Sequence, residues 1–169
     1  TSLPPELGQL TALTELNLRD NRLTRLPPEL GRLTALEALS VQDNQLTSLA
    51  PELGQLTALT VLFLGGNPLT SLPPELGQLT ALTELYLHGN PELGLPLEVL
   101  GPKWDEVFLG NAKPASPRAI LDYYFALQEQ GKRPLNEVRL VLVGRGGAGK
   151  TSVVERLVKD RFDPKQAET

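Results

Sequence analysis

Residues 144–151 read GRGGAGKT and match the pattern GxxxxGK[ST] at every fixed position. Glycines let the backbone curl so that several N–H groups converge on one point, which makes a cradle for phosphate. An apolar run at 138–143 precedes the loop and a helix-like run at 152–161 follows it. This strand, loop and helix order is the setting that the motif requires. The pattern therefore predicts a site for the phosphates of a nucleotide.

Two side chains of the motif carry specific roles. We expect Lys150 to pair with the β- and γ-phosphates and the Thr151 hydroxyl to coordinate Mg²⁺. Arg145 occupies a variable position and receives no role. The predicted nucleotide-binding residues are Gly144, Gly147, Ala148, Gly149, Lys150, Thr151 and Ser152. A glycine-rich turn that matches by chance is the alternative, and the loop alone does not distinguish GTP from ATP.

Few residues follow the loop. The chain ends 18 residues after Thr151 (169−151), without an aspartate-bearing metal motif or a base-reading motif. One strand and one helix do not build a doubly wound domain. We therefore expect a truncated nucleotide-binding fragment, with no catalytic residue of its own and no activity alone.

A repeat of 23 residues fills the first part of the chain, and such a period is typical of a solenoid. Each unit follows LxxLxLxxNxLxxLPxxLxxL, in which the alternating leucines predict a short strand. The leucines of the LPxxLxxL segment are predicted to point inward from the convex side. The recurring asparagines are expected to bond backbone groups of neighbouring coils. Equivalent leucines are Leu13, Leu36, Leu59 and Leu82, and equivalent asparagines are Asn21, Asn44, Asn67 and Asn90.

Three columns of side chains are predicted to face away from the leucine core, on the concave face. The columns are Glu15, Ala38, Val61 and Glu84; Asn17, Ser40, Phe63 and Tyr86; and Arg19, Gln42, Gly65 and His88. Phe63 and Tyr86 form an exposed aromatic pair in this arrangement, of a kind enriched at protein contacts. The candidate protein-binding residues are therefore Phe63, Tyr86, Arg19 and His88. The alternative is an ordinary strand surface.

The repeat pattern breaks after Asn90. We expect residues 105–109 to form a final strand, with Trp104, Val107 and Phe108 covering the last leucine layer.

A helix is predicted to begin at Ser116 and Pro117, which supply a capping side chain and a proline for the first turn. Gly131 is expected to end it. Tyr124 is assigned a packing role on its apolar face. The predicted domains are the array with its cap (1–110), the connector helix with its hinges (111–136) and the nucleotide-binding fragment (137–169).

Composition excludes several classes of function. A net charge of −4 and a pI near 5.1 give no basis for nucleic-acid binding. Apolar runs fall short of the roughly 18 residues of a membrane span. The chain has no cysteine and one histidine, which argues against thiolate or histidine-based metal and catalytic sites. A reducing, cytoplasmic location is consistent with this composition.

The array resembles the leucine-rich-repeat family over residue 1 to about residue 104. With the connector AILDYYF and the segment NEVRLVLVGRGGAGKTSVVERL, the chain as a whole resembles the Roco family. This resemblance implies an α/β fold, with a solenoid of short parallel strands on its concave face and a C-terminal cap. The connector helix and the start of a Ras-like, doubly wound Roc domain follow.

The Roco resemblance also implies an activity. It implies a GTPase that uses GTP, GDP and Mg²⁺, forms homodimers through a COR domain and contacts a protein partner or its own GTPase domain through the repeats. Thr169 matches the switch threonine of that family. Two alternatives stay open: a non-catalytic leucine-rich-repeat interaction scaffold, and an ATPase with attached repeats. The order of the parts, repeats first, favours the Roco arrangement over the ATPase.

Overall fold

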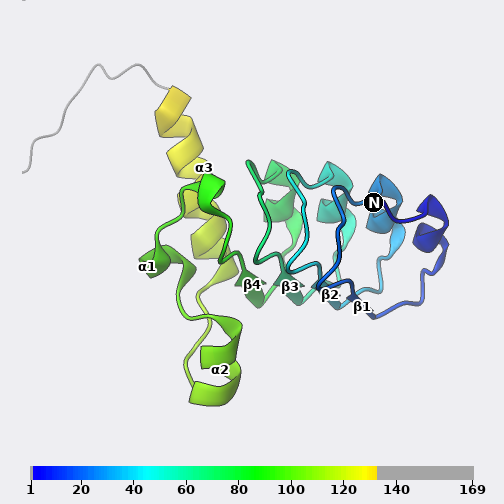
Figure 1. Ribbon diagram of the computed structural model, residues 1–169, viewed down its shortest axis with the longest axis horizontal. Helices are drawn as coiled ribbons and strands as arrows, with labels where there is room; N and C mark the ends of the chain where they lie inside the picture. The colour runs from blue at the N-terminus through cyan, green and yellow to red at the C-terminus, as the bar shows by residue number, and fades with distance from the viewer. Residues whose placement is uncertain (1, 133–169) are drawn as a thin grey trace, which may run out of the picture. The chain divides into compact units, whose positions relative to one another are not determined.

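Four three-residue strands form one parallel sheet in the order β1-β2-β3-β4 (Figure 1). They are β1 (Glu15–Asn17), β2 (Ala38–Ser40), β3 (Val61–Phe63) and β4 (Glu84–Tyr86). The computed structural model describes residues 2–132. The predicted strand at 138–143, the phosphate loop and the helix at 152–161 lie outside the described residues.

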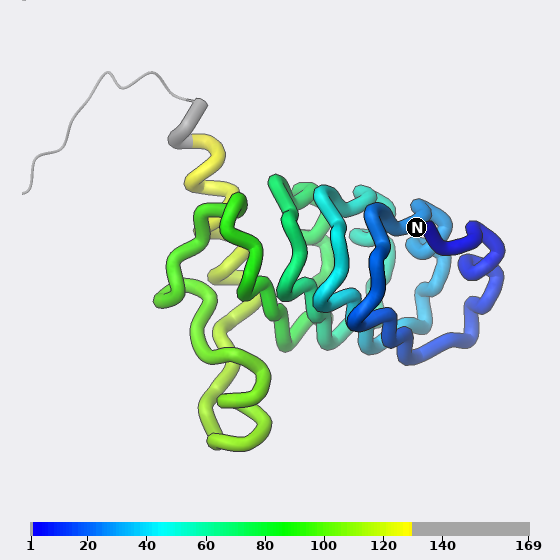
Figure 2. Tube along the Cα trace, in the orientation of Figure 1, coloured from blue at the N-terminus to red at the C-terminus, as the bar shows by residue number. Residues whose placement is uncertain are grey.

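A 3-10 helix on the opposite side of each coil completes the repeat. These helices are η1 (Pro5–Gln9), η2 (Pro28–Arg32), η3 (Pro51–Gln55) and η4 (Pro74–Gln78), with a shorter η5 (Pro91–Leu93) after β4. A proline at the first position fixes φ and needs no N–H partner, so it starts each turn. Figure 2 traces the coils as loops of similar size from the N-terminus onward.

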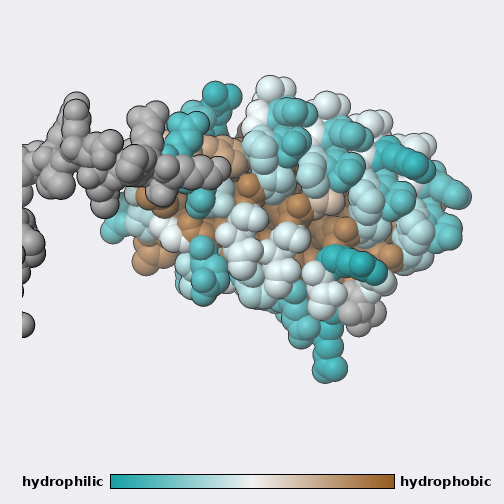
Figure 3. All heavy atoms as spheres, turned by 90° about the horizontal axis from the view of Figure 1, so that it is seen from above, coloured by the Kyte–Doolittle hydropathy of each residue, from teal (hydrophilic) through white to brown (hydrophobic). Residues whose placement is uncertain are grey.

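Leucines fill the space between the strands and the 3-10 helices. In the inner coils they are fully buried, as Leu39 and Leu62 show at 0% and 1% exposure. The leucines around the first strand, Leu13, Leu16 and Leu18, are only partly buried. Viewed from above, apolar atoms of successive coils form a band along the array between rows of polar residues (Figure 3). Each coil therefore depends on its neighbours for burial, as in other solenoids.

Buried asparagines connect the coils, as predicted. The Asn67 Oδ1 accepts a hydrogen bond from the Leu46 N–H at 3.0 Å, and its Nδ2 donates to the Val41 and Leu64 carbonyls at 3.0 Å. Asn44 and Asn90 repeat this arrangement one coil before and after. The side chain of Asn21 is exposed and donates only within its own coil. Buried polar groups need such partners, because leaving one unpaired costs about 1–3 kcal/mol.

Glycine sets how closely the 3-10 helices stack. A Cβ added at Gly54 would lie 2.5 Å from the Glu75 carbonyl oxygen of the next coil, and Gly8 and Gly31 meet the next coil in the same way. At Gly77 a Cβ would meet nothing within 4 Å. The stacking of 3-10 helices thus stops at η4.

Three helices follow the array: α1 (Leu97–Leu100), α2 (Trp104–Gly110) and α3 (Pro117–Lys132). The leucine core continues into Leu100 of α1 and into Ile120, Leu121 and Tyr124 of α3. The expectation that Trp104, Val107 and Phe108 cover the last leucine layer is therefore wrong. Trp104 and Phe108 are exposed, and α2 contains no buried residue.

The predicted strand at 105–109 is also wrong, because these residues lie in α2. The Glu106 carboxylate accepts a hydrogen bond from the Lys103 N–H at 2.7 Å, which caps the first turn. Asn111 ends the helix in the left-handed region, at φ 56°. These local signals, together with acidic residues in the first turn, outweigh the strand preference of Val107 and Phe108.

Helix α3 begins as predicted and packs on the array. The Ala119 N–H donates to the Ser116 Oγ at 3.4 Å, and Pro117 opens the helix. Tyr124 is 1% exposed, and its hydroxyl accepts a hydrogen bond from the Leu72 N–H at 3.1 Å. The packing role of Tyr124 is thus confirmed. Gly131 does not end the helix, which continues to Lys132.

Gly54, which contacts the next coil, and Gly77, which contacts none, allow a matched test of the stacking. We expect Gly54→Ala to lower the free energy of unfolding by about 1–3 kcal/mol, because the new Cβ overlaps backbone that cannot move alone. Gly77→Ala should be neutral or raise it by up to about 1 kcal/mol, because the methyl group meets open space and the unfolded chain loses freedom. Urea unfolding of both variants measures the difference. Equal losses would contradict the stacking account.

Candidate functional site

The strand register aligns the predicted columns. Glu15, Ala38, Val61 and Glu84 are paired in one row of the sheet, and Asn17, Ser40, Phe63 and Tyr86 in another. The strand leucines between them point into the core. We call the outward side of the four strands the strand surface. Its side chains stand on backbone whose N–H and C=O groups already bond neighbouring coils, so the surface is a rigid platform.

The aromatic pair on this surface is only partly exposed. Phe63 and Tyr86 stack with ring centroids 5.0 Å apart and an interplanar angle of 7°. Tyr86 is 3% exposed, so its prediction as an exposed residue is wrong, whereas Phe63 is half-buried. The sequence pattern could not show this, because Tyr86 lies on the last strand, beside the segment that closes the array.

The hydroxyl of Tyr86 is held in place. It donates a hydrogen bond to the Glu84 Oε2 at 2.7 Å. Burial raises the pKa of Tyr86 above its ordinary value, and the hydrogen bond to the Glu84 carboxylate and its charge raise it further. The ring therefore remains neutral and packs as an aromatic wall.

Trp104 and Phe108 of α2 extend the aromatic pair. Trp104 meets Phe63 edge-on, with centroids 6.2 Å apart, and stacks with Phe108 at 4.9 Å. We call Tyr86, Phe63, Trp104 and Phe108 the aromatic row. Exposure rises along it, from 3% at Tyr86 to 40% at Trp104 and 69% at Phe108. The sequence interpretation missed the two α2 members, because it placed them over the core.

The third predicted column borders a hollow beside the aromatic row. Arg19 and Gln42 carry long side chains, whereas Gly65 occupies the equivalent position in the next coil. The hollow measures about 450 Å³ and its lining includes Gly65, Gly66, Gly89, Asp43, Tyr86, His88, Trp104 and Asp105. Because three of these residues are glycines, we call it the glycine hollow. Of the predicted contact residues, Arg19, His88 and Tyr86 all line this hollow.

Polar bonds fix the edge of the glycine hollow. The Arg19 guanidinium pairs with Asp20 at 3.3 Å and with Asp43 at 3.2 Å. The His88 Nε2–H donates to the Gly101 carbonyl at 3.0 Å, which ties the segment leading into α2 to the end of β4. His88 thus both holds this segment in place through a hydrogen bond and lines the glycine hollow.

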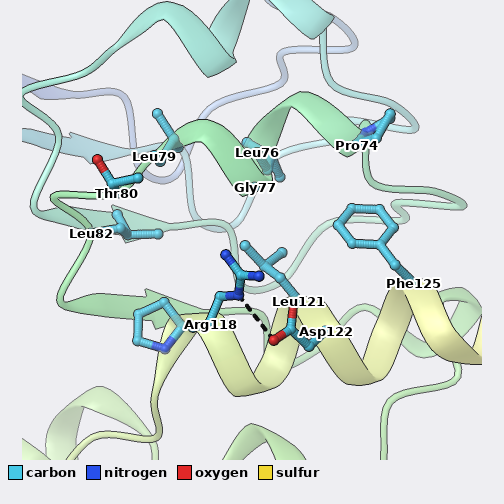
Figure 4. A pocket seen from close by; sticks show the side chains of 11 residues that line it. Pro74, Leu76, Gly77, Leu79, Thr80, Leu82, Arg118, Leu121, Asp122 and Phe125 are labelled. Carbon is cyan, nitrogen blue, oxygen red and sulfur yellow. Dashed lines mark hydrogen bonds and ion pairs between the residues drawn. The ribbon is translucent and has the colours of Figure 1, made fainter.

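A second groove lies between η4 and α3 and measures about 390 Å³ (Figure 4). Leu76, Gly77 and Leu79 form one side, and Leu121 and Phe125 of α3 form the other. An Arg118–Asp122 ion pair at 2.9 Å lies along its edge, on the exposed side of α3. The groove exists because no further 3-10 helix stacks on Gly77.

Neither cavity contains a cluster of metal-ligating side chains. Within residues 2–132 no three His, Cys, Asp or Glu side chains converge in a way that could hold a metal ion. No helix among the same residues is long and apolar enough to cross a membrane. The predicted nucleotide and Mg²⁺ ligands, Gly144 to Ser152, lie outside the described part of the chain. What the described residues offer is a rigid surface with aromatic and charged side chains.

Comparisons with known proteins agree with the repeat architecture. A family profile described as a leucine-rich repeat region matches residues 2–93. A leucine-rich-repeat protein of Leptospira interrogans is 41% identical with a TM-score of 0.52, over 53% of this chain and 23% of its own. The leucine-rich repeat domain of the type III effector XopL is 30% identical with a TM-score of 0.51, over 54% of this chain and 34% of its own.

The plant peptide hormone receptor RGFR1, in complex with RGF2, is 37% identical with a TM-score of 0.50, over 53% of this chain and 15% of its own. The chain thus spans about a third or less of the length of these proteins. The search of curated proteins gave no match.

The raised pKa of Tyr86 predicts a pH dependence of stability. Folded chains keep the hydroxyl proton at a pH where unfolded chains, with a tyrosine pKa of about 10, release it. The unfolded state then binds fewer protons, so the free energy of unfolding falls as the pH rises above about 10. We expect Tyr86→Phe to reduce that decline. Urea unfolding from pH 8 to 11 tests this, and parallel declines in both proteins would refute it.

Proposed function

Because the chain belongs to the leucine-rich-repeat family, we propose that it is a protein-interaction module that binds a partner through its strand surface. The observation that supports this most directly is the aromatic row, which starts on the strand surface and grows more exposed towards α2. Aromatic side chains are enriched among residues that dominate binding energy. The structure of the similar plant receptor in complex with RGF2 is consistent with binding by such an array.

The strand surface suits recognition for a physical reason. Its backbone hydrogen bonds are made between coils, so a partner meets preorganised side chains and loses little affinity to ordering the receptor. Val61 and Phe63 present apolar groups at its centre, and Glu15 and Glu84 present charge at its ends. Shape and charge both vary along the array, as specificity requires.

A displayed random-peptide library tests this proposal. We expect peptides selected on the intact chain to lose at least tenfold in affinity with Val61→Arg, because the long charged side chain stands at the centre of the strand surface. Gln55→Arg is the matched control on the opposite side, where η2 already carries Arg32 at the equivalent position. Peptides that lose equal affinity with both variants, or with Gln55→Arg alone, would contradict binding at the strand surface.

The sequence of residues 144–151 supports a second, finer proposal. We propose that the repeats serve as the regulatory arm of a Roco-type GTPase to which this chain contributes the phosphate loop. In this proposal Lys150 contacts the nucleotide phosphates and Thr151 contacts Mg²⁺, and the protein binds GTP and GDP. The protein would form dimers through a COR domain and act in the cytoplasm. The motif and its flanking apolar and helix-like segments are what support it.

Nucleotide binding by the protein with its complete nucleotide domain tests the second proposal. Lys150→Ala should abolish binding of a fluorescent GDP analogue in the presence of Mg²⁺, because the lysine supplies the charge opposite the phosphates. Arg145→Ala, at a variable position of the same loop, should leave the affinity within about twofold. Equal affinities of wild type and Lys150→Ala would exclude the phosphate-loop role. A preference for ATP would exclude the GTPase assignment.

A further inference from the structure

The exposed side of α2 is an apolar surface with nothing over it in the described chain. Trp104, Phe108 and Leu109 are 40%, 69% and 80% exposed, and they lie within one seven-residue helix. Single exposed apolar residues are common, but three on one short helix form a patch of the kind that marks an interaction site. In Figure 1, α2 projects from the array beyond β4.

The glycine hollow adjoins this patch, because Trp104 belongs to both. Gly65, Gly66 and Gly89 line the hollow with bare backbone, and a Cβ added at any of them would meet a neighbouring atom at 3.0 Å or less. At Gly66, φ is +65° and a Cβ would collide with the Asp43 Oδ1, so the position favours glycine twice over. A volume of about 450 Å³ admits one long side chain of a partner.

The charges around the patch and the hollow decide which side chain fits. The carboxylates on the strand surface, its turns and α2 are Glu15, Asp20, Asp43, Glu84, Asp105 and Glu106, and the cations are Arg19, Arg22 and Lys103. Asp43, Asp105, Arg19 and Lys103 line the hollow itself. Arg19 is already shared between Asp20 and Asp43. Lys103 is exposed at the start of α2, so its ammonium can turn into water. Over this wider surface the six carboxylates outnumber the three cations, which favours a cationic partner.

We propose that the glycine hollow and the α2 patch together bind a partner segment in which an arginine is flanked by leucine or another large apolar residue. This rests on the proposed interaction function and narrows it to one partner chemistry. The guanidinium enters the hollow between the Trp104 ring and the carboxylates of Asp43 and Asp105, and the apolar neighbour covers Phe108 and Leu109. Arginine suits this hollow better than lysine, because its planar group stacks on aromatic rings and its N–H groups fit carboxylates.

Trp104 is the only tryptophan of the chain, so its fluorescence reports on the site directly. The probe is the peptide acetyl-Gly-Leu-Arg-Leu-Gly-amide, and the comparison peptide replaces arginine with neutral citrulline of nearly the same shape. We expect a saturable change in Trp104 emission with the arginine peptide and at least a tenfold weaker affinity with the citrulline peptide. Added salt should weaken the arginine peptide more than the citrulline peptide.

Variants locate the interaction. Asp105→Asn and Asp43→Asn should each weaken the arginine peptide several-fold, and asparagine tolerates the left-handed φ of 55° at position 43. Phe108→Ala should weaken both peptides, because it removes the apolar contact but no buried group. Asp122→Asn on α3 is the charge-matched control and should change neither affinity.

Several outcomes would overturn this inference. They are equal affinity for the arginine and citrulline peptides, tighter binding of a peptide with glutamate in place of arginine, or no saturable change at millimolar peptide. If library peptides sensitive to Val61→Arg lack arginine, the interaction function stands and the arginine proposal fails. If no library peptide depends on Val61, the interaction function fails, whatever the short peptides show.

Discussion

Three buried amides hold successive coils of this molecule at one fixed offset. Asn44, Asn67 and Asn90 each accept a hydrogen bond from the preceding coil and donate to carbonyl groups of both coils. A shift of one residue between coils would break these bonds and leave buried polar groups without partners. The same shift would turn the strand leucines outward. The amides therefore determine which side chains stand on the strand surface, and in which columns.

The candidate site lies where this regular stacking ends. No 3-10 helix stacks on Gly77, and α1 and α3 cover the leucine layer instead. Since those two helices close the core, α2 is not needed there and its apolar residues lie outside. Trp104 then continues the aromatic row begun by Tyr86 and Phe63, with an edge-on contact to Phe63. The candidate site thus combines repeated positions of the array with one segment that has no counterpart in the repeat.

The sequence predicted the repeated part of the structure well, because a period of 23 residues repeats each inference in every coil. The strands, the columns and the asparagine ladder follow from alternation and spacing alone. Residues 104–110 occur once and have no such check. Their strand-like Val107 and Phe108 conflict with capping by Glu106 and Asn111, and the capping signals prevail in the structure. The burial of Tyr86 was missed for the same reason, because the segment beside it has no counterpart in the repeat.

The glycine hollow was not predictable as a cavity. A glycine in the third column shows that a side chain is missing, but not whether another group fills the space. The path of residues 101–105 past Gly65 and His88 makes the space a hollow rather than an open surface. The sequence therefore predicted the columns of side chains, but not the segment 101–105 that encloses the hollow beside them.

Because the offset between coils is the same throughout, the length of the array is set by the number of coils. Neighbouring strands lie about 4.8 Å apart, so the gain or loss of one 23-residue coil moves the first strand by that step relative to α2. Every new junction would be made by the same glycine, leucine and asparagine contacts as the old ones. Evolution could thus change the span between Glu15, at the first strand, and the aromatic row in whole steps. A ligand that bridges the two ends would be selected by its length as well as by its chemistry.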